Sequence, residues 1–230
     1  MRVAIYAIGD LHLSFGTTKP MDIFRGWKDY VARLCESWNA QVLPDDTVVL
    51  AGDTSWGMSL EEALPDFRWI DALPGKKILL KGNHDYWWTS RRKMEECFEE
   101  NRLHTLRILH NNSYEEEDAA LCGTRGWMLD ETTAHDKKIG AREEGRLRAS
   151  LRSAGDTAGE KIVFLHYPPV YQGQISGTML DVMHEYGVRR CFYGHLHGQS
   201  CRAALEGMYE GIDFCLISAD HLGFRLKRIQ

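Results

Sequence analysis

The sequence has no long hydrophobic run. No stretch of its 230 residues approaches the roughly 18 consecutive apolar positions of a membrane-spanning helix. The first ten residues are a short apolar stretch without the hydrophobic region and cleavage site of a secretory signal peptide. We therefore expect a cytoplasmic protein with no membrane partner.

The cysteines show no pairing pattern. The six cysteines form no Cys-x-x-Cys pair, and several stand in apolar runs, as buried free thiols do. Disulfide frameworks belong to small secreted chains, whereas a chain of this length buries a core without them. A reducing compartment fits this pattern.

An excess of basic charge is also missing. The chain has 28 Lys and Arg against 33 Asp and Glu, a formal net charge of -5, and the two signs are interspersed. Proteins that grip nucleic acid by its phosphates carry a basic patch or stripe. We therefore do not expect a nucleic-acid partner, and we interpret the acidic run Glu115–Asp118 as a solvated loop.

Repeats, low-complexity segments and linkers are absent, which predicts a single domain over residues 1–230. What is present is an alternation of apolar strands and amphipathic helices, followed by a half that is richer in strands. This order predicts an α/β fold with two packed sheets and helices outside. The strands and helices that matter below are expected at Val3–Ile8, Phe24–Gln41, Thr47–Ala51, Leu60–Leu73, Lys77–Lys81, Ala119–Cys122, Gly140–Ala154, Ile162–His166, Arg190–Tyr193, Ala203–Leu205 and Phe224–Lys227.

Polar side chains follow five of the predicted strands, often after a glycine. Ligand sites of α/β sheets form at the carboxyl ends of strands, so these side chains are expected to meet. The motifs are Gly9-Asp10-Leu11-His12, Gly52-Asp53, Gly82-Asn83-His84-Asp85, His166, and Gly194-His195-Leu196-His197.

The residue types in these motifs indicate a metal centre. Asp, His and Asn without Cys suit divalent ions such as Mn, Fe, Zn, Co or Ni. Asp10 and His12 are two apart, as are His195 and His197, so each pair projects to one side of an extended chain. The ligands are too many for one tetrahedral ion, whereas two ions about 3.5–4 Å apart, bridged by a carboxylate, would use them all.

Each motif alone has a plainer explanation. An Asp after a strand is commonly a turn former or a helix N-cap, and a single His is more often a core or surface residue. The ordered occurrence of five motifs favours a site. The other histidines lack such a context and are interpreted as structural: His104, His110, His135, His184 and His221.

The ordered set, from Asp10 to His197, resembles that of the calcineurin-like metallophosphoesterases. The resemblance implies a four-layer α/β/β/α sandwich of two mixed β-sheets flanked by helices, with a dinuclear metal site at the strand ends. It further implies that Asp53 bridges the two ions. One ion would take Asp10, His12, Asp53 and His197, and the other Asp53, Asn83, His166 and His195.

The resemblance also implies an activity. A metal-dependent hydrolase of phosphate mono- or diesters would use attack by metal-bound hydroxide, with His84 as the general acid that protonates the leaving oxygen. Asp85 would orient or anchor the turn. A nuclease on the same core and a non-catalytic scaffold with this fold are the alternatives; the charge balance disfavours the first, and retention of His84 and all the ligands disfavours the second.

One segment departs from the pattern. The protein phosphatases of this superfamily have an Asp and an Arg shortly after the bridging Asp, where this chain has Thr54-Ser55-Trp56-Gly57. A small-molecule phosphate ester is therefore the expected substrate. Arg125 and Trp127 also follow a predicted strand, and we interpret them as substrate contacts, with a structural turn as the alternative. The sequence leaves the oligomeric state open.

Overall fold

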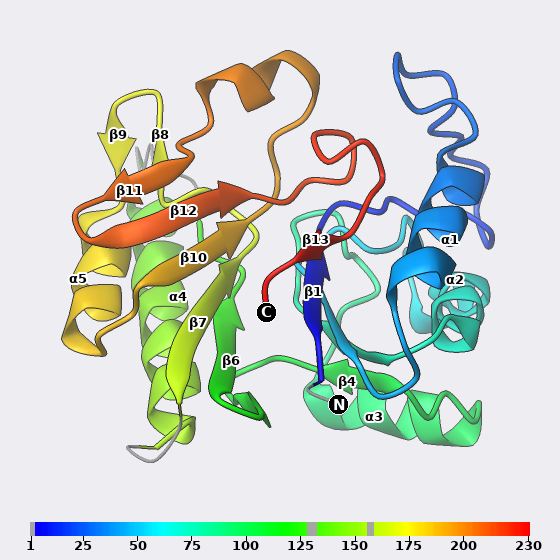
Figure 1. Cartoon of the computed structure of the whole chain (residues 1–230), viewed down its shortest axis with the longest axis horizontal. Helices are drawn as coiled ribbons and strands as arrows, with labels where there is room; N and C mark the ends of the chain where they lie inside the picture. Colours follow the sequence, from blue (N-terminus) through cyan, green and yellow to red (C-terminus); the bar gives the residue numbers. More distant parts are fainter. Residues whose placement is uncertain (1–2, 128–132, 156–158) are drawn as a thin grey trace.

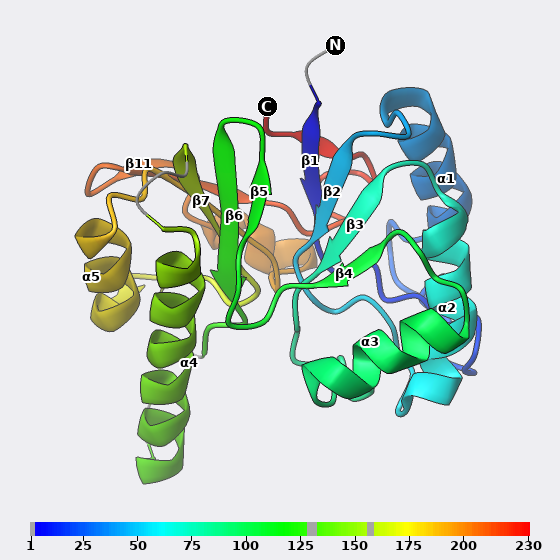
Figure 2. The ribbon, with the colours of Figure 1, turned by 90° about the horizontal axis from the view of Figure 1, so that it is seen from below.

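The computed structural model describes residues 3–127, 133–155 and 159–230. Two β-sheets face each other, with helices on the outer side of each (Figures 1 and 2). Both sheets are mixed, so the prediction of a four-layer sandwich is confirmed. No helix in the described part of the chain is both long and apolar enough to cross a membrane.

The first sheet is formed mainly by the N-terminal half of the chain. Its strands β1 to β4 are parallel and the short β13 pairs antiparallel with β1. Helices α1 to α3 lie outside it (Figure 2). In sheet order the strands are β13 (Lys227–Arg228), β1 (Ile5–Ile8), β2 (Thr47–Leu50), β3 (Lys76–Leu79) and β4 (Leu106–Ile108), and the helices are α1 (Tyr30–Gln41), α2 (Leu60–Ala72) and α3 (Arg91–Glu100).

The second sheet has four parallel central strands with an antiparallel strand at each edge. Helices α4 (Ala134–Ser153) and α5 (Gly177–Glu185) lie outside it (Figure 1). In order the strands are β11 (Gly207–Tyr209), β12 (Ile212–Leu216), β10 (Arg190–Tyr193), β7 (Glu160–Leu165), β6 (Ala119–Thr124) and β5 (Tyr114–Glu116). A small hairpin, β8 (Val170–Tyr171) and β9 (Gln174–Ile175), and a 3₁₀ helix (Gly198–Ala203) complete the described elements.

The strands are apolar throughout because both of their faces are covered. On β1 and β2, Ile5 and Val49 pack between the sheets, whereas Ile8 and Val48 pack against the outer helices. A strand buried on both faces reads as a continuous hydrophobic run, and this is why the sequence located these strands well.

Two helices begin at other residues than the sequence suggests. The helix expected from Phe24 begins at Tyr30, because Gly26 and Asp29 have positive φ angles of 91° and 53°, which interrupt a right-handed helix. The helix expected from Gly140 begins at Ala134, where Thr133 and Asp136 form a capping box. By contrast, the helix expected at Leu60–Leu73 is confirmed to within one residue, since it continues through Pro65 and ends at Ala72.

The remaining differences lie in the C-terminal third and at one hairpin. The strand expected at 203–205 is replaced by the end of the 3₁₀ helix. The strand expected at 224–227 forms only at its last residue, since Phe224 has a φ of 61° within a turn. The acidic run is not simply a loop, because Glu115 and Glu116 belong to the edge strand β5.

Candidate metal centre

The carboxyl ends of β1, β2 and β3 meet those of β7 and β10 where the two sheets join. Gly9 after β1 forms a parallel bridge with Ser218, beyond β12 of the second sheet. Within the second sheet, the backbone N–H of Gly194 donates to the carbonyl of His166 at 3.1 Å. These links bring the five polar motifs of the sequence to one place.

The first group of potential metal ligands consists of Asp10, His12 and His197, whose ligand atoms lie within 4.8 Å of one another. The Nε2 atoms of His12 and His197 are 3.3 Å apart, and Nε2 of His197 is 3.5 Å from Oδ1 of Asp10. Three ligand atoms converging on one point in this way are the arrangement that a divalent ion requires.

The second group lies on the opposite side of Asp53. Asn83 directs its Oδ1 towards two imidazoles, at 2.7 Å from Nε2 of His166 and 2.9 Å from Nδ1 of His195. Nε2 of His166 is 3.5 Å from Oδ2 of Asp53. Asp10, Asp53 and His166 also form a set whose ligand atoms lie within 4.8 Å of one another.

Asp53 stands between the two groups. The same Oδ2 atom lies 3.8 Å from Nε2 of His12 and 3.5 Å from Nε2 of His166. Asp10, a member of the first group, also approaches the second, but its short contact there is with Nδ1 of His166, at 3.8 Å. That nitrogen lies 3.1 Å from the carbonyl of Ala51 and is engaged there. Asp53 is therefore the better placed of the two carboxylates to bridge.

Two of the imidazoles are oriented by a partner on their far nitrogen. His166 places Nδ1 against the carbonyl of Ala51, and His197 places Nδ1 2.9 Å from Oδ1 of Asp220. Such contacts hold the ring and leave Nε2 directed at the centre, as is typical of metal-binding histidines. Sequence reasoning missed Asp220, although it follows a strand of the second sheet as the other motif residues do.

Glycines allow the ligands to approach one another. A Cβ atom on Gly82 would lie 2.1 Å from Oδ1 of Asp53, and one on Gly194 would lie 2.4 Å from Oδ2 of Asp10. Both distances are far below van der Waals contact, so a larger residue at either position would displace a carboxylate of the centre.

The local backbone differs from the sequence expectation. Asp10, His12, Asp53 and His195 all have positive φ angles, of 60°, 46°, 49° and 72°. Asp10 and His12 therefore share a side of the chain because of this left-handed turn, and the explanation by extended backbone is wrong. Positive φ costs about 1–3 kcal/mol at a non-glycine residue, and residues held in this way cluster at functional sites.

Asp85 holds the loops together. Its buried carboxylate accepts hydrogen bonds from the backbone N–H groups of Asp53 and Gly82, at 2.9 and 2.7 Å, and from Nε1 of Trp87 at 3.0 Å. The N–H of Thr54 adds a bond of 2.8 Å. The residue expected to anchor the turn thus ties the loop after β2 to the loop after β3.

The electrostatics of the cluster suit cations. Burial, with the nearby Asp10 charge, raises the pKa of Asp53 to about 8. Burial also lowers the pKa of His12 to about 3 and that of His195 to about 4. These imidazoles are therefore neutral at pH 7 and keep a lone pair for a metal. The donor set fits two divalent ions, and their binding would displace the protons that the raised pKa values of Asp53 and His197 favour.

His84 lies beside the ligands without joining either group. Its ring is half-buried, 4.7 Å from the Trp56 ring, 5.8 Å from the His12 ring and 6.1 Å from the ring of Tyr86. The backbone N–H of His84 donates to Oδ1 of Asp53 at 2.7 Å, which fixes the residue next to the bridge. Its buried Nδ1 has no hydrogen-bond partner among the described residues.

Arg125 and Trp127 lie on the side of the second group. The carbonyl of Arg125 accepts from the N–H of His166 at 3.1 Å, and Trp127 packs on Tyr167, which in turn packs on His195. The guanidinium of Arg125 lies 4.7 Å above the Trp127 ring and 3.4 Å from the buried carboxylate of Glu143.

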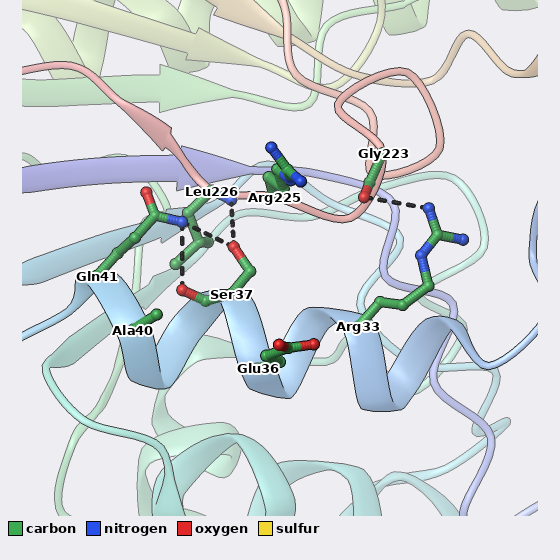
Figure 3. A pocket seen from close by; sticks show the side chains of 8 residues that line it. All are labelled: Arg33, Glu36, Ser37, Ala40, Gln41, Gly223, Arg225 and Leu226. Atoms are coloured by element: carbon green, nitrogen blue, oxygen red, sulfur yellow. Dashed lines mark hydrogen bonds between the residues drawn. The ribbon is translucent and has the colours of Figure 1, made fainter.

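A pocket of about 500 Å³ lies elsewhere, between α1 and the C-terminal segment (Figure 3). It is lined by Arg33, Ser37, Gln41 and Arg225, among others, and contains none of the predicted ligands. The five histidines interpreted as structural are likewise absent from the ligand groups found in the described chain.

The comparisons with solved structures agree with this architecture. A protein of unknown function from Aquifex aeolicus superimposes with a TM-score of 0.51 at 16% identity, over 99% of this chain and 96% of its own. GAP50, described as the anchor in the inner membrane complex of Plasmodium, gives a TM-score of 0.54 at 13% identity, over 95% and 72%. At such identities the similarity concerns the fold alone.

The sequence comparisons identify the family. The Gene 66 protein of Mycobacterium phage L5 is 40% identical over 80 residues, which cover 33% of this chain and only 37% of the phage protein. A sequence model of the calcineurin-like phosphoesterases matches residues 3–199, a range that contains every predicted ligand and His84. With this match and the converging ligand groups, the chain belongs to the calcineurin-like phosphoesterase family.

Proposed function

We propose that this protein hydrolyses phosphate mono- or diesters of small molecules with two divalent metal ions, of the kinds Mn, Fe, Zn, Co or Ni. The observation that carries the proposal is the position of Asp53. One of its oxygens lies within 4 Å of an imidazole from each ligand group, at 3.8 Å from His12 and 3.5 Å from His166.

Two bound ions would neutralise the phosphoryl oxygens and lower the pKa of a water molecule, which makes it a nucleophile near neutral pH. The chain itself holds the ligands in place. Asp10, His12 and His197 form one side, Asn83, His166 and His195 form the other, and Asp53 joins them. Because these groups are pre-oriented by Asp85, Asp220 and the Ala51 carbonyl, little reorganisation is needed at reaction.

His84 supplies the proton in this proposal. Its ring lies beside the ligand groups and outside both of them, so it is free to contact a substrate oxygen. Donation to the departing oxygen is a role worth roughly 10²–10⁴-fold in rate.

The segment after Asp53 supports a small substrate. Thr54 and Ser55 donate their N–H groups to Asp85, and Trp56 stacks on His12 at 4.8 Å, so the positions are used to build the centre. In place of a clamping arginine at this point, Arg125 would contact the phosphate, and Trp127 would cover the leaving group.

The test is hydrolysis of a panel of phosphate mono- and diesters by protein loaded with each candidate metal. We expect metal-dependent release of phosphate or alcohol from at least one class. Absence of hydrolysis with every metal, in protein shown to contain two ions, would instead favour the non-catalytic scaffold.

A further inference from the structure

A lysine stands at the edge of the centre. Nζ of Lys19 lies 4.7 Å from the centre of the Trp56 ring and 4.0 Å from Sδ of Met58. Within the described part of the chain, the contacts of its Nζ are thus to two uncharged groups. An ammonium group of this kind is normally left in water, because holding it over an exposed ring is worth only about 0.5–1 kcal/mol.

The segment that carries Lys19 is fixed rather than free. At its start, the N–H of Phe15 donates to Oδ1 of Asp66 at 2.7 Å. In its middle, Sδ of Met21 accepts from Nε1 of Trp56 at 3.3 Å, and Met21 itself is buried. The backbone on both sides of Lys19 is therefore anchored, and this places the lysine next to the Trp56 ring.

Trp56 connects Lys19 to the reacting groups. The same ring stacks on His12 at 4.8 Å and lies 4.7 Å from the ring of His84. The ring of Tyr86, whose residue is 52% exposed, lies on another side of His84 at 6.1 Å. The Trp56 ring already contacts His12 and Lys19. The exposed ring of Tyr86 is therefore the aromatic surface beside His84 that is open to a substrate.

If His84 protonates the leaving oxygen, the leaving group lies beside His84, so the groups around that ring would border it together with Trp127. We propose that Lys19 is a specificity-determining residue that binds an anionic group on the leaving group of the substrate, such as a carboxylate or a second phosphate. The preferred substrates are then phosphate esters of alcohols or phenols that themselves carry negative charge. This inference rests on the proposed phosphoesterase function.

The test uses two substrates that differ by one anionic group, phenyl phosphate and 4-carboxyphenyl phosphate, with metal-loaded protein. For each variant the ratio of kcat/KM for the two substrates is measured. The intrinsic difference between the leaving groups cancels when the ratio of a variant is divided by that of the wild type. Three variants are compared: Lys19→Gln, Lys19→Arg, and Lys28→Gln as a matched exposed control.

We expect Lys19→Gln to lower the preference for the carboxylated substrate by roughly two- to fivefold, mainly through KM, as for an exposed ion pair. Lys19→Arg and Lys28→Gln should keep the preference, and added salt should reduce it in the wild type but not in Lys19→Gln. An unchanged ratio in Lys19→Gln, with the wild type active on both substrates, would overturn the inference. A wild type inactive on every phosphate ester, despite bound metal, would overturn the proposed function instead.

Discussion

Nδ1 of His197 and Oδ1 of Asp220 lie 2.9 Å apart, and this contact aims the other nitrogen of the imidazole at Asp10 and His12. Asp220 with Asp10 also raises the pKa of His197 to about 10, against the lowering effect of burial. Asp220 is thus a positioning residue for the first ligand group, in the manner of the carboxylate–histidine–metal triads.

We predict that Asp220→Ala weakens the first metal by about 10–100-fold, because the His197 ring loses its orientation and part of its basicity. Titration with a chelator as competitor would measure the two affinities. Asp213→Ala, on the exposed side of β12, is the matched control and should leave both unchanged. Equal metal affinity in Asp220→Ala and the control would contradict the role of Asp220.

A second prediction separates the bridging ligand from a terminal one. Asp53→Asn and Asp53→Ala should weaken both ions, because Oδ2 of Asp53 faces both groups, whereas His12→Ala should mainly affect one ion. Elemental analysis after gel filtration gives the stoichiometry of each variant. An Asp53 variant with full metal content and wild-type turnover would show that the bridge is assigned to the wrong residue.

A third prediction separates binding from proton donation at Asn83 and His84. His84→Asn should keep the metals, because His84 belongs to neither ligand group. Its turnover should fall by about 10²–10⁴ on esters with a poor alkoxide leaving group, and less on nitrophenyl esters, which need little protonation. Equal losses on both substrates would mean that His84 positions the phosphate, and no loss would exclude a catalytic role.

A fourth prediction concerns Arg125. If its guanidinium contacts the substrate, Arg125→Ala should raise KM for the best substrate. Arg146 is a matched control, because its guanidinium pairs with the same buried carboxylate, that of Glu143, at 2.5 Å. Arg146 and Glu143 both belong to α4. Arg146→Ala should lower the melting temperature without changing KM. An Arg125→Ala variant with wild-type KM and kcat would remove Arg125 from the substrate site.

The strands and the motif residues could be predicted from the sequence because each signal is local. Buried strands read as apolar runs, and residues such as Asp10, Asn83 and His166 come shortly after the ends of such strands. The two-sheet architecture followed from the order of the elements. The predicted ligands do meet in the fold, although the reason given for the Asp10 and His12 pair, an extended chain, was wrong.

The parts that sequence reasoning missed depend on turns and on distant contacts. Asp220 acts through His197, 23 positions away, and belongs to none of the five motifs recognised in the sequence. The helix expected from Phe24 begins six residues later because of the left-handed residues Gly26 and Asp29. Lys19 and Trp56 meet only in the folded chain, so their spacing in the sequence carries no signal.

The central claim is that Asp53 joins two metal ions in one centre that hydrolyses phosphate esters. Its most direct test is the metal content of the protein, measured by elemental analysis together with phosphoesterase activity, before and after removal and return of divalent ions. The account predicts close to two ions per chain, loss of hydrolysis on their removal, and recovery of both on reconstitution. Protein that binds no metal after reconstitution, and shows no metal-stimulated activity, would contradict it.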